Sequence, residues 1–252
     1  MNASDLQQAE ERSAREAAGG SGDKSRYVRA MFSDIAPRYD LLNHLLSFNV
    51  DRSWRRKAIH ALRWQAAPRG VYLDLCAGTL DVAAALASQA GFAGRVVAAD
   101  FSEAMLRMGK AKVQRQPVDS VAADALTLPL PNDSCAGAIV AFGVRNLSDL
   151  DAGLREVRRV LAPGGRFVIL ECSTPPNAFV RWGYHAYFHH VLPRIGGLLS
   201  GNRGAYRYLP ESVAHFPGAP QLADRLRRAG FGDVQWQPLT FGVAAIHVGT
   251  RI

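Results

Sequence analysis

Short apolar runs alternate with helical patterns along the chain from residue 71 onward. Strands that alternate with helices in this way predict a parallel sheet covered by helices on both faces. The expected strands are 71–75, 95–99, 118–122, 136–142 and 165–171, and the expected helices are 79–90, 102–115 and 149–161. A later helix is expected near 219–229, and the runs 233–240 and 242–249 are expected to pair as a hairpin around Phe241 and Gly242.

Three segments fall outside this alternation. Residues 1–25 are polar and contain a Gly-Gly-Ser-Gly run, so we expect a disordered tail. Residues 26–66 predict helices, with a break at Pro37 and Ser53 as the cap of a helix that ends near Trp64. Residues 173–215 are rich in aromatic, His, Gly and Pro residues, which is typical of an insertion that forms a lid or a substrate pocket. The whole of 26–252 is expected to be one domain.

Composition narrows the function classes. Three scattered cysteines predict neither a disulfide framework nor a zinc site. The chain has no secretory leader and no run of about 20 apolar residues, so we expect a cytoplasmic protein, peripheral to a membrane at most. The formal net charge of +8 is compatible with nucleic acid, with an anionic membrane, or with a solvated basic surface. RNA binding would need basic and aromatic residues interleaved on one surface, and no such cluster is visible.

The segment Val71 to Asp100 carries the candidate chemistry. It reads as a buried strand, a turn, a helix and a second strand that ends in a carboxylate. Ligands of parallel sheets bind beyond the carboxyl ends of the strands, where Asp100 could accept hydrogen bonds from both hydroxyls of a ribose. A dinucleotide site needs three spaced glycines in the turn, whereas this turn has Gly78 alone. The pattern therefore favours S-adenosylmethionine over a nicotinamide cofactor.

The other acids fit the same ligand. Asp74 could meet its amino group, directly or through water, and Asp124 or a neighbouring backbone group could meet the adenine amino group. Each acid also has a structural alternative, since Asp100 with Ser102 could simply cap the following helix.

Several motifs give the chain a resemblance to a known family. They are Met31–Asn43 (MFSDIAPRYDLLN), Leu73–Leu75, Ala99–Asp100 with Met105–Leu106, FGVRN at 142–146, VLAPGG at 160–165, HVLPRIG at 190–196 and YRYLPES at 206–212. With these runs, residues 26–252 resemble the ubiquinone/menaquinone biosynthesis C-methyltransferases of the UbiE/MenG type. The Pro-Gly-Gly turn is common among methyltransferases, but the FGVRN, HVLPRIG and YRYLPES runs are far more selective.

This resemblance implies a class I methyltransferase fold, a Rossmann-like seven-stranded sheet with an antiparallel last hairpin. It implies methylation of a ring carbon of a polyprenylated quinol, with a naphthoquinol, a benzoquinol or both as substrate. The implied cofactor positions are Thr79, Asp100, Asp124, Ala125 and Ala141. The family often has glycine where Ala77 and Leu80 stand, Asn at 124 and Ser at 141.

The mechanism requires ionisation of a ring hydroxyl beside the attacking carbon. Arg145 is the candidate that stabilises the phenolate, Asn146 could orient the same oxygen, and Tyr39 could relay the proton. As alternatives, Arg145 pairs with a surface acid, Asn146 caps a helix and Tyr39 packs in the core. One of His185, His189 and His190 could be the base, although a packing role is more frequent. No metal is expected, because direct attack on a sulfonium needs none.

Two partners follow from the substrate. The aromatics of 184–190, Leu198–Leu199 and the segment Leu41–Phe48 could line the path of a polyprenyl tail. The basic run Arg55-Arg56-Lys57 could rest on anionic lipid or form the wet side of a packed helix. Both a monomer and a homodimer stay open.

Overall fold

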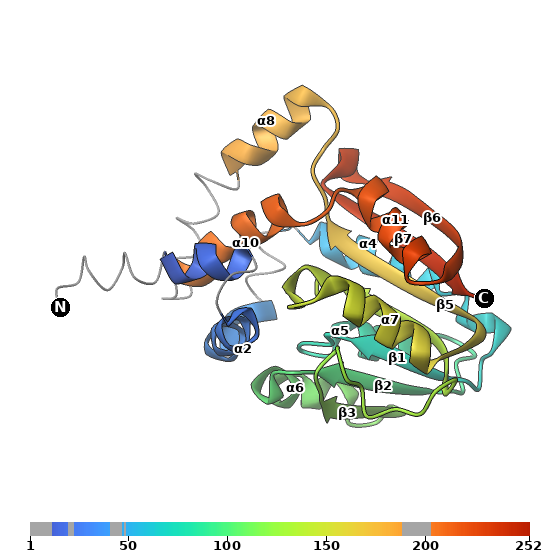
Figure 1. The fold of residues 1–252 in the computed structure, drawn as a ribbon. Coiled ribbons are helices and arrows are strands. Elements are labelled where there is room, and N and C mark those ends of the chain that lie inside the picture. Colours follow the sequence, from blue (N-terminus) through green and yellow to red (C-terminus); the bar gives the residue numbers. More distant parts are fainter. Residues whose placement is uncertain (1–11, 20–22, 41–46, 48, 188–202) are drawn as a thin grey trace.

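A seven-stranded sheet forms the centre of the computed structural model, which describes residues 12–19, 23–40, 47, 49–187 and 203–252 (Figure 1). The strand order is β3-β2-β1-β4-β5-β7-β6. The first five strands are parallel, and β7 runs antiparallel to both of its neighbours. The strands are β1 (Val71–Leu75), β2 (Arg95–Asp100), β3 (Val118–Ala122), β4 (Cys135–Ala141), β5 (Leu161–Cys172), β6 (Phe231–Leu239) and β7 (Ala244–Arg251). The expected class I fold is confirmed.

Helices cover both faces of the sheet, as the alternating pattern predicted. One face packs against α4 (Val50–Ala61) and α5 (Asp81–Ala87) in a core that contains Tyr72, Ile139 and Val168. The opposite face packs against α7 (Leu150–Val160) and α11 (Ala219–Arg228) in a core that contains Leu73, Val140 and Phe167. Side chains that are adjacent along a strand enter different cores because a strand alternates its faces.

Two helix predictions differ from the structure. The helix expected over 102–115 is α6 (Glu103–Gly109) followed by the 3-10 turn η3 (Lys110–Val113). Gly109 lies so close to the turn after β1 that a Cβ there would clash with the Thr79 carbonyl oxygen. The cap expected at Ser53 is wrong, since α4 begins one turn earlier, after Asn49 in a left-handed conformation.

A third core lies beyond the carboxyl ends of the strands. Here α2 (Lys24–Ile35), α8 (Ala178–Ala186) and α10 (Arg203–His215) gather (Figure 1). Val28 and Met31 of α2 share this core with Tyr184 of α8 and Tyr208 of α10. The disordered tail predicted for 1–25 is wrong in part, because residues 12–18 are helical and α2 begins at Lys24. Ala14, Ala17 and Ala18 supply the apolar surface that holds that short helix in the third core.

The structure also bears on the cysteines, on membrane spans and on the predicted path of the polyprenyl tail. The three cysteines are free, and Cys135 is fully buried. None of the helices in the described ranges is both long and apolar enough to cross a bilayer. Of the predicted path of the polyprenyl tail, residues 41–46, 48, 188–190 and 198–199 lie outside the described residues. His189 and His190 are among them, and the side chain of His185 is also outside.

Candidate functional site

The turn after β1 folds back over the end of β2. Cys76, Gly78 and Leu80 all have positive φ angles, of 52°, 53° and 66°. Left-handed backbone costs about 1–2 kcal/mol for a residue with a side chain, so tertiary contacts must hold Cys76 and Leu80 in this shape. The Gly78 N–H donates to Asp100 Oδ2 at 2.9 Å, and the Ala77 N–H donates to the Ala99 carbonyl at 3.1 Å. The glycine turn and the end of β2 therefore form one unit.

Asp100 stands at the centre of this unit with 6% of its surface exposed. Its Oδ1 accepts the Ser102 N–H at 2.8 Å, in addition to the Gly78 bond on Oδ2. Burial raises the pKa of Asp100, and the two backbone hydrogen bonds and Arg29 oppose that rise. Each carboxylate oxygen still has a second lone pair for a ligand hydroxyl. Ser102 is the N-cap residue of α6 and makes no side-chain cap hydrogen bond, so the capping alternative is not what the structure shows. The Asp100 side chain lines the cavity described next.

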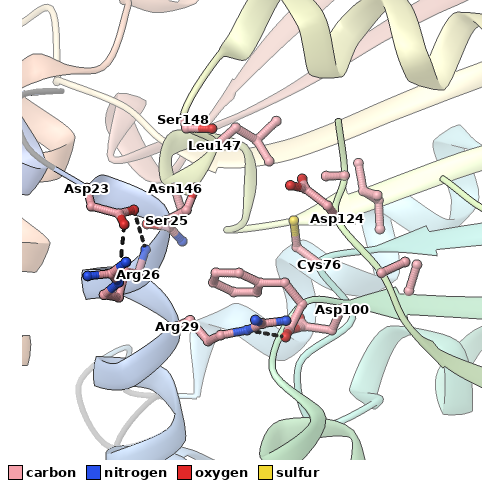
Figure 2. Close-up of a pocket in the computed structure, with 15 residues that line it drawn as sticks. Asp23, Ser25, Arg26, Arg29, Cys76, Asp100, Asp124, Asn146, Leu147 and Ser148 are labelled. Atoms are coloured by element: carbon pink, nitrogen blue, oxygen red, sulfur yellow. Dashed lines mark hydrogen bonds and ion pairs between the residues drawn. The ribbon is translucent and has the colours of Figure 1, made fainter. Parts of the chain in front are cut away.

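A cavity of about 320 Å³ opens beside Asp100 (Figure 2). Its floor consists of the ends of β1 and β2, its sides are the loops after β3 and β4, and the first two turns of α2 cover it. The lining residues are Asp23, Ser25, Arg26, Arg29, Leu75, Cys76, Ala99, Asp100, Phe101, Ala123, Asp124, Ala125, Asn146, Leu147 and Ser148. Of the predicted site residues, Asp100, Asp124, Ala125 and Asn146 thus meet around one cavity.

The remaining predicted cofactor residues lie around this cavity without lining it. Asp74 turns toward α5, where its Oδ2 accepts the Ala83 N–H at 2.9 Å. It is 1% exposed, and burial raises its pKa to about 8. Gly78 reaches the cavity through its bond to Asp100, whereas Ala141 ends β4 at a half-buried position outside the lining. Asp74 therefore supports α5 in this structure.

Thr79 belongs to a polar network under the turn. Its hydroxyl donates to Asp40 Oδ1 at 2.5 Å, and Lys112 Nζ lies 2.5 Å from both Asp40 Oδ2 and Asp81 Oδ1. Asp81 also accepts from Arg55 Nη1 at 2.9 Å. The network connects Asp40 of the N-terminal segment, α4 and η3 to the glycine turn after β1.

Arg145 lies on the 3-10 turn η4 (Val144–Asn146), beside the cavity-lining residue Asn146, but it does not line the cavity itself. Its Nη1 donates to Glu171 Oε1 at 2.6 Å and to the Phe142 carbonyl at 2.7 Å. Burial lowers the pKa of Arg145, but Glu171, with smaller contributions from Cys172, Tyr39 and Tyr208, raises it above its ordinary value. The alternative in which Arg145 pairs with a surface acid is wrong, because its partner Glu171 is 1% exposed.

The other two catalytic candidates, Asn146 and Tyr39, contact different parts of the molecule. Asn146 Oδ1 accepts the Tyr208 hydroxyl of α10 at 3.2 Å, so the amide joins the cavity wall to the third core. Tyr39 packs edge to face with Phe32, with ring centroids 5.8 Å apart. Its Cε1 lies 4.0 Å from the position that a Cβ on Gly78 would take. Tyr39 therefore stands next to the glycine turn.

Sequence reasoning missed the α2 side of the cavity. Arg29 Nε donates to the Phe101 carbonyl at 2.9 Å, and its guanidinium lies 5.9 Å from the Phe101 ring centroid (Figure 2). Arg26 and Arg29 share one helical face, which is a weak signal that many surface helices also carry.

Comparison with known proteins decides the family. Residues 21–251 match the model of the ubiE/COQ5 methyltransferase family. The chain belongs to this family. It is therefore a methyltransferase, as the motifs indicated. A demethylmenaquinone methyltransferase of Thermus thermophilus is 50% identical over 223 residues, which cover 88% of this chain and 100% of that relative. A ubiquinone/menaquinone biosynthesis C-methyltransferase of Geobacter sulfurreducens is 45% identical over 91% of this chain and 90% of its own length.

Solved structures of more distant proteins share the fold of this chain. The [4+2]-cyclase SpnF has a TM-score of 0.65 at 16% identity, over 90% of this chain and 96% of its own. A SAM-dependent methyltransferase of Thermotoga maritima has a TM-score of 0.61 at 16% identity, over 88% of this chain and 99% of its own. These likenesses concern the fold alone.

Proposed function

We propose that this methyltransferase transfers a methyl group from S-adenosylmethionine to a ring carbon of a polyprenylated quinol. The substrates are demethylmenaquinol, which gives menaquinol, and/or 2-methoxy-6-polyprenyl-1,4-benzoquinol. The observation that carries the proposal is the 50% identity to a demethylmenaquinone methyltransferase over that relative's whole length. Another lipid or small-molecule C-methyltransferase is the alternative.

The cavity fits the adenosine part of S-adenosylmethionine. Asp100 is held by two backbone N–H groups, which fixes its oxygens for the ribose hydroxyls. Asp124 and Ala125 border the same cavity on the side assigned to adenine. Gly78 has a φ of 53° and no side chain, so its backbone leaves room for the methionine part. When bound, the sulfonium supplies an electrophilic methyl group.

Residues of η4 and its surroundings provide the environment for the ring. A quinol ring carbon is a poor nucleophile until a neighbouring hydroxyl loses its proton. The Arg145 guanidinium stabilises the resulting phenolate by charge and hydrogen bonding. Asn146 orients that oxygen, and Tyr39 relays the proton from its place beside the glycine turn. Alignment of the attacking carbon with the methyl group is the main task left to the protein.

The insertion 173–215 and the exposed basic residues complete the proposal. We assign to the insertion the role of a lid, since Tyr184 and Tyr208 pack against α2 beyond the cavity. The protein acts in the cytoplasm and touches the inner face of the membrane to reach the polyprenyl tail. Arg56 and Lys57 of α4 are exposed, but Arg55 is 13% exposed and pairs with Asp51 and Asp81, so it does not contribute to a lipid contact.

The test is methyl transfer in vitro with purified protein. Demethylmenaquinol and the benzoquinol, each kept reduced under anaerobic conditions, are incubated with labelled S-adenosylmethionine, and products are identified by mass spectrometry. We expect turnover of at least one quinol and none of the matching quinone, which has no hydroxyl to ionise. Equal turnover of the quinone, or failure with both quinols, would refute the proposal.

A further inference from the structure

Glu171 is a buried acidic residue near the carboxyl end of β5, an inner strand of the sheet. It is the second-last residue of β5 and pairs in register with Ala245 of β7. It follows the apolar run FVIL and is 1% exposed. A carboxylate removed from water in this way costs several kcal/mol unless a charge and hydrogen bonds compensate for it. Its presence therefore calls for a specific partner.

The partner is Arg145, and the bonds leave one edge of the guanidinium unused. Glu171 Oε1 accepts Arg145 Nη1 at 2.6 Å and the Cys172 N–H at 2.8 Å. The backbone N–H of Arg145 points at Glu171 Oε2 from 3.4 Å. Arg145 Nη1 also donates to the Phe142 carbonyl. Arg145 Nε is buried and has no hydrogen-bond partner among the described residues. An unpaired buried donor costs about 1–3 kcal/mol, so Nε is a donor for which no described residue supplies the acceptor.

We infer that Glu171 is the positioning residue of Arg145, and that its charge controls how strongly Arg145 acidifies the substrate hydroxyl. This inference rests on the proposed function. Glu171 holds the Nη1 edge on the rigid end of β5, which directs the opposite edge away from the strand. Its negative charge also compensates the guanidinium, so the bound quinol meets a nearly neutral pair.

Two substitutions separate position from charge. Glu171→Gln keeps an oxygen that can accept the Nη1 bond but removes the negative charge. The uncompensated guanidinium should then favour ionisation of the quinol hydroxyl, and the acid limb of the kcat–pH profile should move down by about one pH unit. Glu171→Asp keeps the charge but withdraws the carboxylate by one methylene. For that variant kcat should fall by roughly 10- to 100-fold while the limb stays in place.

A structural role of Glu171 would give a different result. If Glu171 were only structural, Glu171→Gln would lower kcat or the amount of folded protein without moving the acid limb of the kcat–pH profile. The affinity for S-adenosylhomocysteine, measured by calorimetry, should stay within about twofold of wild type in both variants, because Glu171 does not line the cavity. Glu156→Gln is the matched control, since Glu156 pairs with Arg159 at 2.7 Å on α7, away from the cavity. It should leave kcat and the limb unchanged.

A second measurement needs no turnover. The ionisation of bound 1-naphthol, followed by absorbance in the presence of S-adenosylhomocysteine, should occur at lower pH in Glu171→Gln than in wild type. An unchanged naphthol pKa in Glu171→Gln, or an unchanged acid limb of the kcat–pH profile in Glu171→Gln that turns over, overturns the inference. If Glu171→Gln does not fold, unchanged kcat in Glu171→Asp overturns it. Wild-type protein that methylates no quinol refutes the proposed function instead, and the naphthol comparison still decides the role of Glu171.

Discussion

Asp100→Asn tests the cofactor site through one change of charge. The carboxylate accepts N–H groups from Gly78 and Ser102 at 2.9 and 2.8 Å, so its position is set by the backbone on both sides. An asparagine of the same shape keeps one acceptor oxygen, and its NH2 group faces a backbone N–H that also donates. The contact between residue 100 and its backbone neighbours loses one hydrogen bond. The ribose hydroxyls then meet one neutral amide oxygen in place of two charged carboxylate oxygens.

The expected loss of affinity follows from these bonds. A hydrogen bond to a charged group contributes about 1.5–3 kcal/mol, and the substitution removes one such bond and weakens another. A loss of about 2–3 kcal/mol corresponds to a dissociation constant about 30- to 160-fold higher for S-adenosylhomocysteine. The fold should persist, because burial raises the pKa of Asp100 and a neutral side chain avoids that desolvation.

Isothermal titration calorimetry with S-adenosylhomocysteine measures the effect. Asp119→Asn is the control, since Asp119 is an exposed acid on β3 that pairs with Arg95. It removes the same charge outside the cavity and should bind the ligand as wild type does. An Asp100→Asn variant that is folded by circular dichroism and binds within threefold of wild type would refute the role of Asp100.

Three further predictions concern the surroundings of the site. Because burial raises the folded pKa of Asp74 from 3.8 to about 8, this group costs stability as the pH rises between those values. Between pH 6 and pH 8 the free energy of unfolding, measured by urea titration, should therefore fall by about 2 kcal/mol more in wild type than in Asp74→Asn. A difference between the two proteins that does not change with pH would contradict this. Gly143→Ala should destabilise by about 1–3 kcal/mol, since its Cβ would clash with the Cys76 side chain, whereas Gly183→Ala, with no atom within 4 Å, should not. Arg145→Lys should lower kcat by roughly 100-fold with unchanged S-adenosylhomocysteine affinity, and joint loss of both would make the residue structural.

Local sequence patterns predicted the sheet because its determinants are local. Leu73 and Leu75 alternate with Tyr72 and Asp74 between the two cores, and the strand 71–75 has the predicted ends. The hairpin of β6 and β7 formed around Phe241 and Gly242, which has a φ of 91° that favours glycine. The ends of α4 and α6 were harder to predict, because tertiary contacts such as that of Gly109 with Thr79 decide them.

The side chains that were placed differently show the limit of this reasoning. Asp74 and Asp100 both occur at or near strand ends in the same motif, and the sequence alone cannot tell which of them reaches a ligand. Strand alternation directs Asp74 to α5, where it accepts the Ala83 N–H, whereas Asp100 lies at the strand tip. The α2 wall of the cavity is a second example. Arg29 meets Phe101 across 72 positions of sequence, and no periodicity encodes such a contact.

Glu171 illustrates why one buried pair was not foreseen. In the sequence it is a single acid after an apolar run, and it could have ended the strand at the surface. In the fold, β5 lies between β4 and β7, and Glu171 pairs in register with Ala245 of β7. The buried carboxylate there pairs with Arg145, 26 positions earlier in the chain. The acid to which we assign the positioning of Arg145 thus stands on an inner strand beside the antiparallel last hairpin, which connects the topology of the sheet to the proposed chemistry.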